Sequence, residues 1–220
     1  MRKAIVPGLL IGAFVASSAA ADGVGECSVA ALQSKAPKGT TITSAVATPA
    51  KDKVPDHCLV DGKTETPGNS VNFRVGFPAK WNGKFLFQGV GGFAGSLGNL
   101  REGLERGYAT ATTDTGHQGS SGTDGSWALN NRPKEIDYGH RGTHAATVAT
   151  QSLTKAFFSN APRYSYFNGC SNGGRQALME AQRYPDDYDG IIAGDPSLGA
   201  LGYANAEKGP KVLAGKLSLH

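Results

Sequence analysis

The sequence predicts an α/β fold, in which a mostly parallel sheet is covered by helices. Strand-like and helix-like patterns alternate from residue 71 to residue 193, which is typical of parallel strands joined by helical crossovers. The chain has 220 residues, enough to bury the core of one domain, and its 31 glycines suit tight turns between such elements. A third observation is Ser171, which lies between glycines where a predicted strand gives way to a predicted helix.

The elements of this sheet are predicted from periodicity. Residues 71–77 alternate apolar and polar side chains, as a half-buried strand does, and residues 84–90 contain an apolar run that ends in glycines. Ala145, Ala149 and Leu153 share one face of a helix with Ala156. The predicted strands span residues 71–77, 84–90, 108–113, 164–168 and 190–193, and the predicted helices span residues 100–106, 142–158 and 173–184.

The N-terminus has the pattern of a secretory signal. Arg2 and Lys3 precede an apolar stretch at 4–16, and Ala19-Ala20-Ala21 offers a cleavage site before Asp22; an uncleaved anchor is the alternative. We therefore expect a secreted or periplasmic protein that begins near Asp22. The expected divisions are a signal peptide at 1–21, a loop-rich N-terminal region at 22–66, a partial core at 67–197 and a weakly structured tail at 198–220.

Charge and hydropathy exclude two classes of partner. The formal net charge is +4, and loss of Arg2 and Lys3 with the signal lowers it to +2. Basic residues are scattered along the chain, so we expect no nucleic-acid partner. No segment after the signal is apolar enough to cross a bilayer, so we expect no membrane association after cleavage.

Three cysteines follow the signal, and an exported protein is expected to pair them. Cys27 and Cys58 both lie in the N-terminal region, before the first strand of the predicted core. We therefore predict a Cys27–Cys58 disulfide, which leaves Cys170 unpaired directly beside Ser171.

The segment Gly169-Cys170-Ser171-Asn172-Gly173 matches the G-x-S-x-G pattern of a nucleophile elbow. The pattern alone is weak, but here a predicted strand precedes it and a predicted helix follows it. A serine on such a sharp turn is exposed as a nucleophile, and the backbone N–H of Asn172 can point at the developing oxyanion. The alternative is a serine that merely caps the helix.

A glycine-rich loop at residues 89–93 follows the apolar run at Phe85 to Phe87. Backbone N–H groups of Gly91 and Gly92 can be aimed at an oxyanion because no side chain stands in the way. A phosphate-binding loop is the rival, but the spacing fits neither of the usual glycine motifs. A plain turn remains the other alternative.

Other clusters of polar residues carry weaker signals. His140 and His144 stand four residues apart, as two metal ligands on a helix can, but no third ligand is evident. The segment 114–117 is interpreted as loop scaffolding at the end of a strand. Asp186, Asp187 and Asp189 could hold calcium, although a solvated turn is the favoured interpretation. We therefore predict no metal site and no cofactor in this chain.

Several motifs in this order resemble the tannase and feruloyl esterase family. The resemblance extends from about Cys27 to Pro196. The matching runs are Trp81-Asn82-Gly83-Lys84, the loop from Gly89 to Gly95, Thr113-Asp114-Thr115-Gly116-His117, Asn168 to Arg175, Glu180 to Pro185 and Tyr188 to Gly194.

The resemblance implies an incomplete α/β-hydrolase sheet that lacks the lid and the final strands. It implies a serine carboxylesterase acting on small esters of aromatic acids such as gallate, ferulate or a terephthalate monoester, with Ser171 as nucleophile. Asn172 and a glycine of the 89–92 loop would be the oxyanion donors. Cys170 corresponds to a cysteine that pairs with another beside the catalytic histidine, and a structural calcium would lie in the lid.

The family places its catalytic acid and histidine after the nucleophile, and here the one histidine that follows Ser171 is His220, the final residue of this sequence. We therefore expect a truncated esterase whose acid and base are absent from these residues. One alternative is a catalytically silent secreted remnant that at most binds a ligand. A serine peptidase is a weaker alternative, because the elbow is the only feature that supports it.

Overall fold

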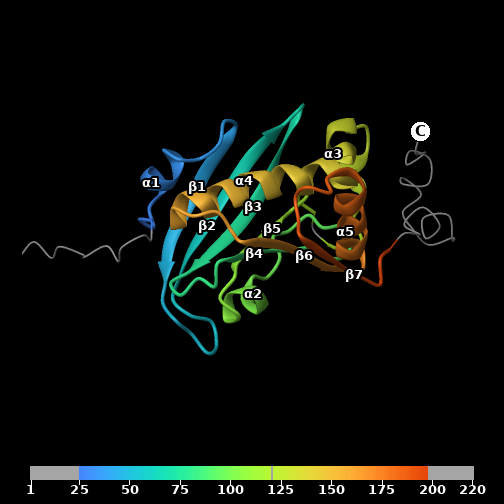
Figure 1. Cartoon of the computed structure of the whole chain (residues 1–220). Coiled ribbons are helices and arrows are strands. Elements are labelled where there is room, and N and C mark those ends of the chain that lie inside the picture. The colour runs from blue at the N-terminus through green and yellow to red at the C-terminus, as the bar shows by residue number, and fades with distance from the viewer. Residues whose placement is uncertain (1–24, 120, 198–220) are drawn as a thin grey trace, which may run out of the picture.

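The computed structural model describes residues 25–119 and 121–197. The predicted signal peptide at 1–21 and the predicted tail at 198–220 lie outside the described residues. A seven-stranded sheet runs through the described part in the order β1-β2-β3-β5-β4-β6-β7 (Figure 1). Its strands are β1 (Thr40–Thr48), β2 (His57–Thr66), β3 (Asn69–Pro78), β4 (Lys84–Gln88), β5 (Ala109–Thr113), β6 (Tyr164–Cys170) and β7 (Gly190–Gly194).

The sheet has an antiparallel half and a parallel half. β1, β2 and β3 form an antiparallel meander, and β3 also pairs antiparallel with β5. From β5 onward the pairings with β4, β6 and β7 are parallel. The α/β class is therefore confirmed, but the sheet is mixed, with three parallel and three antiparallel pairings, rather than mostly parallel.

The structure corrects the expectation of a loop-rich region at residues 22–66. Two long strands, β1 and β2, occupy most of it and pair from Thr40 opposite Thr64 to Thr48 opposite His57. The prolines of this region lie outside the strands, with Pro49 after β1 and Pro55 before β2. They mark the turns of a meander, where a missing backbone N–H costs the ladder nothing.

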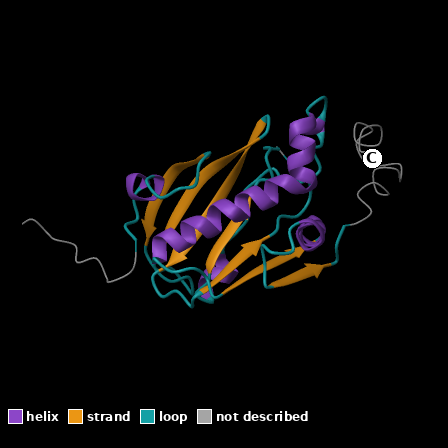
Figure 2. Cartoon of the chain, turned by 45° about the horizontal axis from the view of Figure 1, so that its top comes forward, coloured by secondary structure: helices purple, strands orange, loops and turns teal. Residues whose placement is uncertain are grey.

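Helices cover the sheet unequally. Helix α4 crosses one face, α5 lies on the same face beyond it, and α2 packs on the opposite face (Figure 2). The predicted helices around 100–106, 142–158 and 173–184 are confirmed, whereas the short helix α1 was not predicted. The helices are α1 (Val29–Gln33), α2 (Arg101–Glu105), α3 (Arg132–Ile136), α4 (Gly142–Phe158) and α5 (Asn172–Arg183), with a 3-10 turn η1 (Ser126–Ala128) and a π-helical turn η2 (Asp137–Arg141).

Aromatic side chains form the core between α4 and the sheet. Phe77 of β3 stacks on Phe157 of α4 with ring centroids 4.5 Å apart, and Phe87 of β4 stacks on Phe167 of β6 at 5.5 Å. All four are buried. Full burial of such a ring contributes about 1.5–3 kcal/mol, so this layer fixes β4 and β6, the strands that carry the candidate site, against their neighbours.

A disulfide joins Cys27 to Cys58 of β2, as predicted, and ties the segment before α1 to the sheet. Within residues 25–119 and 121–197, no helix has the length and apolarity needed to span a bilayer.

Candidate active site

Ser171 occupies the sharp turn between β6 and α5. Its backbone dihedrals are φ 58° and ψ −121°, in a region that residues other than glycine rarely adopt. The residue is exposed, and its hydroxyl makes no hydrogen bond with any described residue. A strained, exposed serine between a strand and a helix is the geometry that a nucleophile elbow requires.

Glycines around the turn allow three backbones to approach closely. A Cβ on Gly169 would overlap the carbonyl oxygen of Gly173, and one on Gly174 would overlap the carbonyl oxygen of Gly194. A Cβ on Gly89 would lie 2.8 Å from the Cα of Gly173. These contacts leave no room for side chains, so the glycines bring β7 and the β4 loop against the start of α5.

The side chain of Asn172 ties the loop after β4 to the elbow. Its Nδ2 donates to the carbonyl oxygen of Val90 at 2.8 Å. Its Oδ1 accepts from the hydroxyl of Tyr138 at 3.0 Å and from Nε of Arg175 at 2.8 Å. The backbone N–H of Val90 in turn donates to Oε1 of Gln176 at 3.0 Å. The loop is therefore held in place before any ligand arrives.

Some backbone N–H groups at the start of α5 and in the loop after β4 have no acceptor among the described residues. The N–H of Asn172, the first residue of α5, has no acceptor among the described residues, as expected for a helix start. The N–H groups of Gly91 and Gly92 also lack described acceptors, and both glycines are exposed. Val90 is excluded as a donor because Gln176 already accepts its N–H.

Three rings pack together next to Asn172, and one of them belongs to Tyr138, which donates a hydrogen bond to Asn172. His117 stacks on Trp127 with centroids 3.7 Å apart, and both rings pack against Tyr138. Burial lowers the pKa of His117 to about 4, because the charged imidazolium loses its hydration. His117 is thus neutral at pH 7, and it makes no hydrogen bond to Ser171.

Asp114 holds the loop that carries His117. Its carboxylate accepts from the backbone N–H groups of Asn72 and Gly116 at 3.0 and 2.9 Å, and from Nδ2 of Asn72 at 2.5 Å. Burial raises the pKa of Asp114, and these hydrogen bonds oppose that effect. The structure therefore agrees with the interpretation of segment 114–117 as scaffolding.

No general base contacts the nucleophile within the described residues. His57 bonds to the carbonyl oxygen of Pro55, His140 to the hydroxyl of Tyr184, and His144 to Asp187. His220 lies outside the described residues. In the part of the chain that the structure describes, the elbow and its backbone donors are assembled without an acid and a histidine.

The family model described as tannase and feruloyl esterase matches residues 58–206, more than half of the chain. The chain belongs to the tannase and feruloyl esterase family. It is 42% identical over 172 residues to an uncharacterized esterase of Xanthomonas campestris, covering 72% of this chain and 30% of that protein. It is 35% identical over 173 residues to a mono(2-hydroxyethyl) terephthalate hydrolase of Piscinibacter sakaiensis, covering 70% of this chain and 29% of that protein.

The crystal structure of feruloyl esterase B from Aspergillus oryzae superimposes with a TM-score of 0.67 at 27% identity, covering 73% of this chain and 35% of that one. The chain therefore spans about a third of the length of the relatives it matches.

Within this tannase and feruloyl esterase fold, Cys170 is the last residue of β6 and immediately precedes Ser171. It is free and exposed. Its sulfur is therefore accessible to another group.

The helical pair His140 and His144 does not converge on one point. His140 Nδ1 meets the hydroxyl of Tyr184 at 2.8 Å, whereas His144 Nδ1 meets Oδ2 of Asp187 at 2.7 Å. Asp186, Asp187 and Asp189 do not converge on one point either. Asp189 accepts a hydrogen bond from the backbone N–H of Ser165, and Asp186 is exposed.

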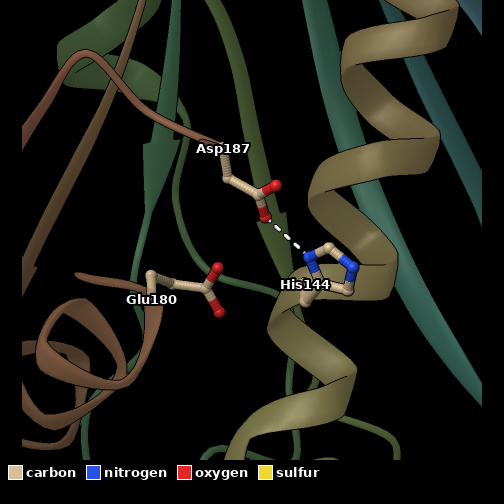
Figure 3. Close-up of side chains that lie close together, drawn as sticks. All are labelled: His144, Glu180 and Asp187. Atoms are coloured by element: carbon tan, nitrogen blue, oxygen red, sulfur yellow. Dashed lines mark hydrogen bonds and ion pairs between the residues drawn. The ribbon is translucent and has the colours of Figure 1, made fainter. Parts of the chain in front are cut away.

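The structure instead groups His144 and Asp187 with Glu180 of α5 (Figure 3). Glu180 is not among the predicted site residues, because nothing in the helical pattern shows that this glutamate is buried.

Proposed function

We propose that this chain provides the nucleophile half of a carboxylic ester hydrolase that acts on small esters of aromatic acids. The observation that carries the proposal is Ser171 itself, strained and exposed on the β6–α5 turn, with the unpaired N–H of Asn172 beside it. A turn of this kind places a hydroxyl and an oxyanion donor on the same carbonyl group of a substrate.

In the proposed reaction, Oγ of Ser171 attacks the ester carbonyl carbon and its proton passes to a general base. The N–H of Asn172, with that of Gly91 or Gly92, stabilises the negative oxygen of the tetrahedral intermediate. Collapse of the intermediate breaks the ester C–O bond, releases the alcohol and leaves an acyl-serine. Water then attacks the acyl-serine and releases the acid.

The substrate class rests on relatives. One is named for a terephthalate monoester and another is a feruloyl esterase, and both acids are aromatic. For the cellular location, we propose export. The disulfide between Cys27 and Cys58 favours an oxidising compartment, and residues 1–21 have the pattern of a signal peptide.

The test requires the protein translated from the whole reading frame, including any codons beyond His220. Purified protein is assayed on methyl ferulate, methyl gallate and mono(2-hydroxyethyl) terephthalate, with ethyl butyrate as the aliphatic comparison. We expect turnover of at least one aromatic ester that falls by about 10³-fold or more in Ser171→Ala. The matched control Ser165→Ala, on the same strand, should keep the activity. Equal activity in wild type and Ser171→Ala contradicts the proposal.

The second candidate is a catalytically silent remnant that at most binds a ligand. The observation that favours it is the lack of any histidine or carboxylate bonded to Ser171 among the described residues. The reading frame separates the two candidates. An in-frame aspartate and a Cys-His pair after residue 220 support the esterase, and a stop codon there supports the remnant.

A further inference from the structure

A cluster of ionisable side chains lies at the end of α5 remote from Ser171. His144 comes from α4, Glu180 from the last turns of α5, and Asp187 from the loop between α5 and β7. One nitrogen or oxygen atom from each of the three lies within 4.8 Å of the others. Figure 3 shows the carboxylate of Glu180 directed toward the imidazole of His144 and the side chain of Asp187 reaching the same space.

Glu180 is the unusual member of the cluster. It is 0% exposed, and neither carboxylate oxygen has a hydrogen-bond partner among the described residues. A buried carboxylate without a cation or a donor is strongly unfavourable, and the neighbouring carboxylate of Asp187 adds repulsion. Burial, followed by the charge of Asp187, raises the pKa of Glu180 to about 9. An ionised Glu180 therefore needs a cation beside it, and without one the carboxyl group holds a proton.

We propose that His144, Glu180 and Asp187 bind a divalent transition-metal ion, with Zn²⁺ as the preferred ion. One imidazole nitrogen and two carboxylate oxygens are a ligand set that Zn²⁺ accepts in proteins, with water completing a tetrahedron. Mg²⁺ and Ca²⁺ prefer oxygen ligands alone, so the imidazole disfavours them.

The ion has a path to the site. The side chain of His144 is 33% exposed and that of Asp187 is 15% exposed, so solvent reaches two ligands while Glu180 closes the interior side. Binding displaces the proton that His144 Nδ1 shares with Asp187, releases to solvent the proton that Glu180 holds at its raised pKa, and draws the three ligand atoms together around the ion.

The site is structural in this proposal. Glu180 lies nine residues along α5 from Ser171, a rise of about 13 Å, too far for the ion to touch a bound ester. An ion there fastens α4, α5 and the following loop to one another. It thereby anchors the helix whose first turn forms the oxyanion site, and the inference holds whether or not the protein is an esterase.

The competing account is a proton instead of a metal ion, in which a neutral Glu180 donates a hydrogen bond to Asp187. Glu180→Gln distinguishes the two, because the amide supplies that hydrogen bond but ligates Zn²⁺ poorly. Asp186→Asn is the matched control, since it removes an exposed carboxylate one residue from Asp187.

The experiment uses the 220-residue protein stripped with a chelator. Zinc content after dialysis, calorimetric titration with ZnCl₂ and thermal unfolding with and without Zn²⁺ are measured. We expect one Zn²⁺ per chain, a rise in Tm with Zn²⁺, and little response to Mg²⁺ or Ca²⁺. Affinity for Zn²⁺ should fall at least tenfold in Glu180→Gln and remain unchanged in Asp186→Asn.

His144→Gln provides a second variant at a partly exposed position, in case Glu180→Gln does not fold, and its affinity should also fall at least tenfold. No zinc on the wild-type protein, or equal zinc binding by wild type and the ligand variants, overturns the proposal.

Discussion

Gly169 has less space around it than any side chain needs, because the backbone of Gly173 faces it across the elbow. We predict that Gly169→Ala destabilises the protein by about 3 kcal/mol, since the added methyl forces β6 and α5 apart. Gly139→Ala is the matched control, because no atom lies within 4 Å of a Cβ at that position. Urea unfolding measures both variants, and a similar small effect of the two would contradict the close packing.

His117 makes stability depend on pH. Its pKa is about 4 in the folded protein, chiefly because burial disfavours the charged ring, and about 6.5 in an unfolded chain. Between these values the unfolded chain binds a proton that the folded protein does not, so unfolding becomes easier as the pH falls from about 6.5 to about 4.

The expected loss from this residue is about 3 kcal/mol across that window. His117→Phe keeps a ring against Trp127 but cannot titrate, so its stability should fall less over the same range. The measurement is the free energy of unfolding of both proteins from pH 4 to pH 7. His57→Gln serves as the control and should follow the wild type. Parallel curves for wild type and His117→Phe would show that His117 is not responsible.

Ser171 and Glu180 differ in how well their environments can be predicted from the sequence. Ser171 is predictable because the elbow is local, and its strand, turn and helix lie within about twenty consecutive residues. Glu180 is not, because its environment is built by His144 and Asp187, and His144 lies 36 residues earlier on another helix. Burial of a charged residue has no signature in helical periodicity.

At the scale of elements, α4 buries threonines as well as apolar residues. Ala149 and Leu153 of the predicted face are buried, but Ala145 and Ala156 are only partly so. The buried positions also include Thr143, Thr147, Thr150 and Thr154. Within α4, a threonine hydroxyl can donate a hydrogen bond to a backbone carbonyl of the preceding turn, so the threonine can be buried without an unpaired donor. A pattern of apolar residues alone therefore underestimates the buried face of the helix.

Replacing two of these threonines by valine should affect stability differently. Thr147 Oγ1 donates to the carbonyl oxygen of Thr143, so the buried hydroxyl of Tyr188 must donate to Thr147. Thr147→Val leaves Tyr188 without that acceptor and should cost about 2 kcal/mol. Thr150 Oγ1 bonds only to backbone carbonyls of its own helix, so Thr150→Val should be nearly neutral. Chemical denaturation of the two isosteric variants checks the difference, and equal losses would refute it.

Strands β1 and β2 show why part of the fold escapes prediction. The buried positions of β2 alternate strictly, but they include Gly62, Thr64 and Thr66, so the alternation is hardly visible in hydropathy. The nearby prolines then favour a loop. The parallel strands are easier to predict, since both faces are covered and the runs are apolar, as at Phe85 to Phe87.

At the scale of the whole molecule, the disulfide joins Cys27 to Cys58, which are separated by 31 positions in the sequence. Loop-closure entropy predicts that Cys27→Ala/Cys58→Ala loses about 3–4 kcal/mol. Peptide mapping without reduction should find the Cys27–Cys58 link, with Cys170 open to alkylation. Linkage of Cys170 to Cys27 or Cys58 would overturn the assignment.

The free edge of the sheet bears on solubility. β7 is one of the two edge strands of the described sheet, β1 being the other, and Ile192 on β7 is 65% exposed. Such an edge can pair with another chain, so we expect the 220-residue polypeptide to self-associate as its concentration rises.

The last prediction concerns catalysis by the 220-residue polypeptide alone. Ser171 is well placed, but its hydroxyl has no hydrogen bond to a histidine in the described residues, so its proton has no acceptor during attack. Exposed Gly91 and Gly92 face water, which weakens electrostatic stabilisation of an oxyanion. We therefore expect negligible turnover of p-nitrophenyl acetate and methyl gallate, with wild type and Ser171→Ala equal at background. Turnover that disappears in Ser171→Ala would show that a base is present after all, and His220→Ala would then test the one histidine that follows the nucleophile.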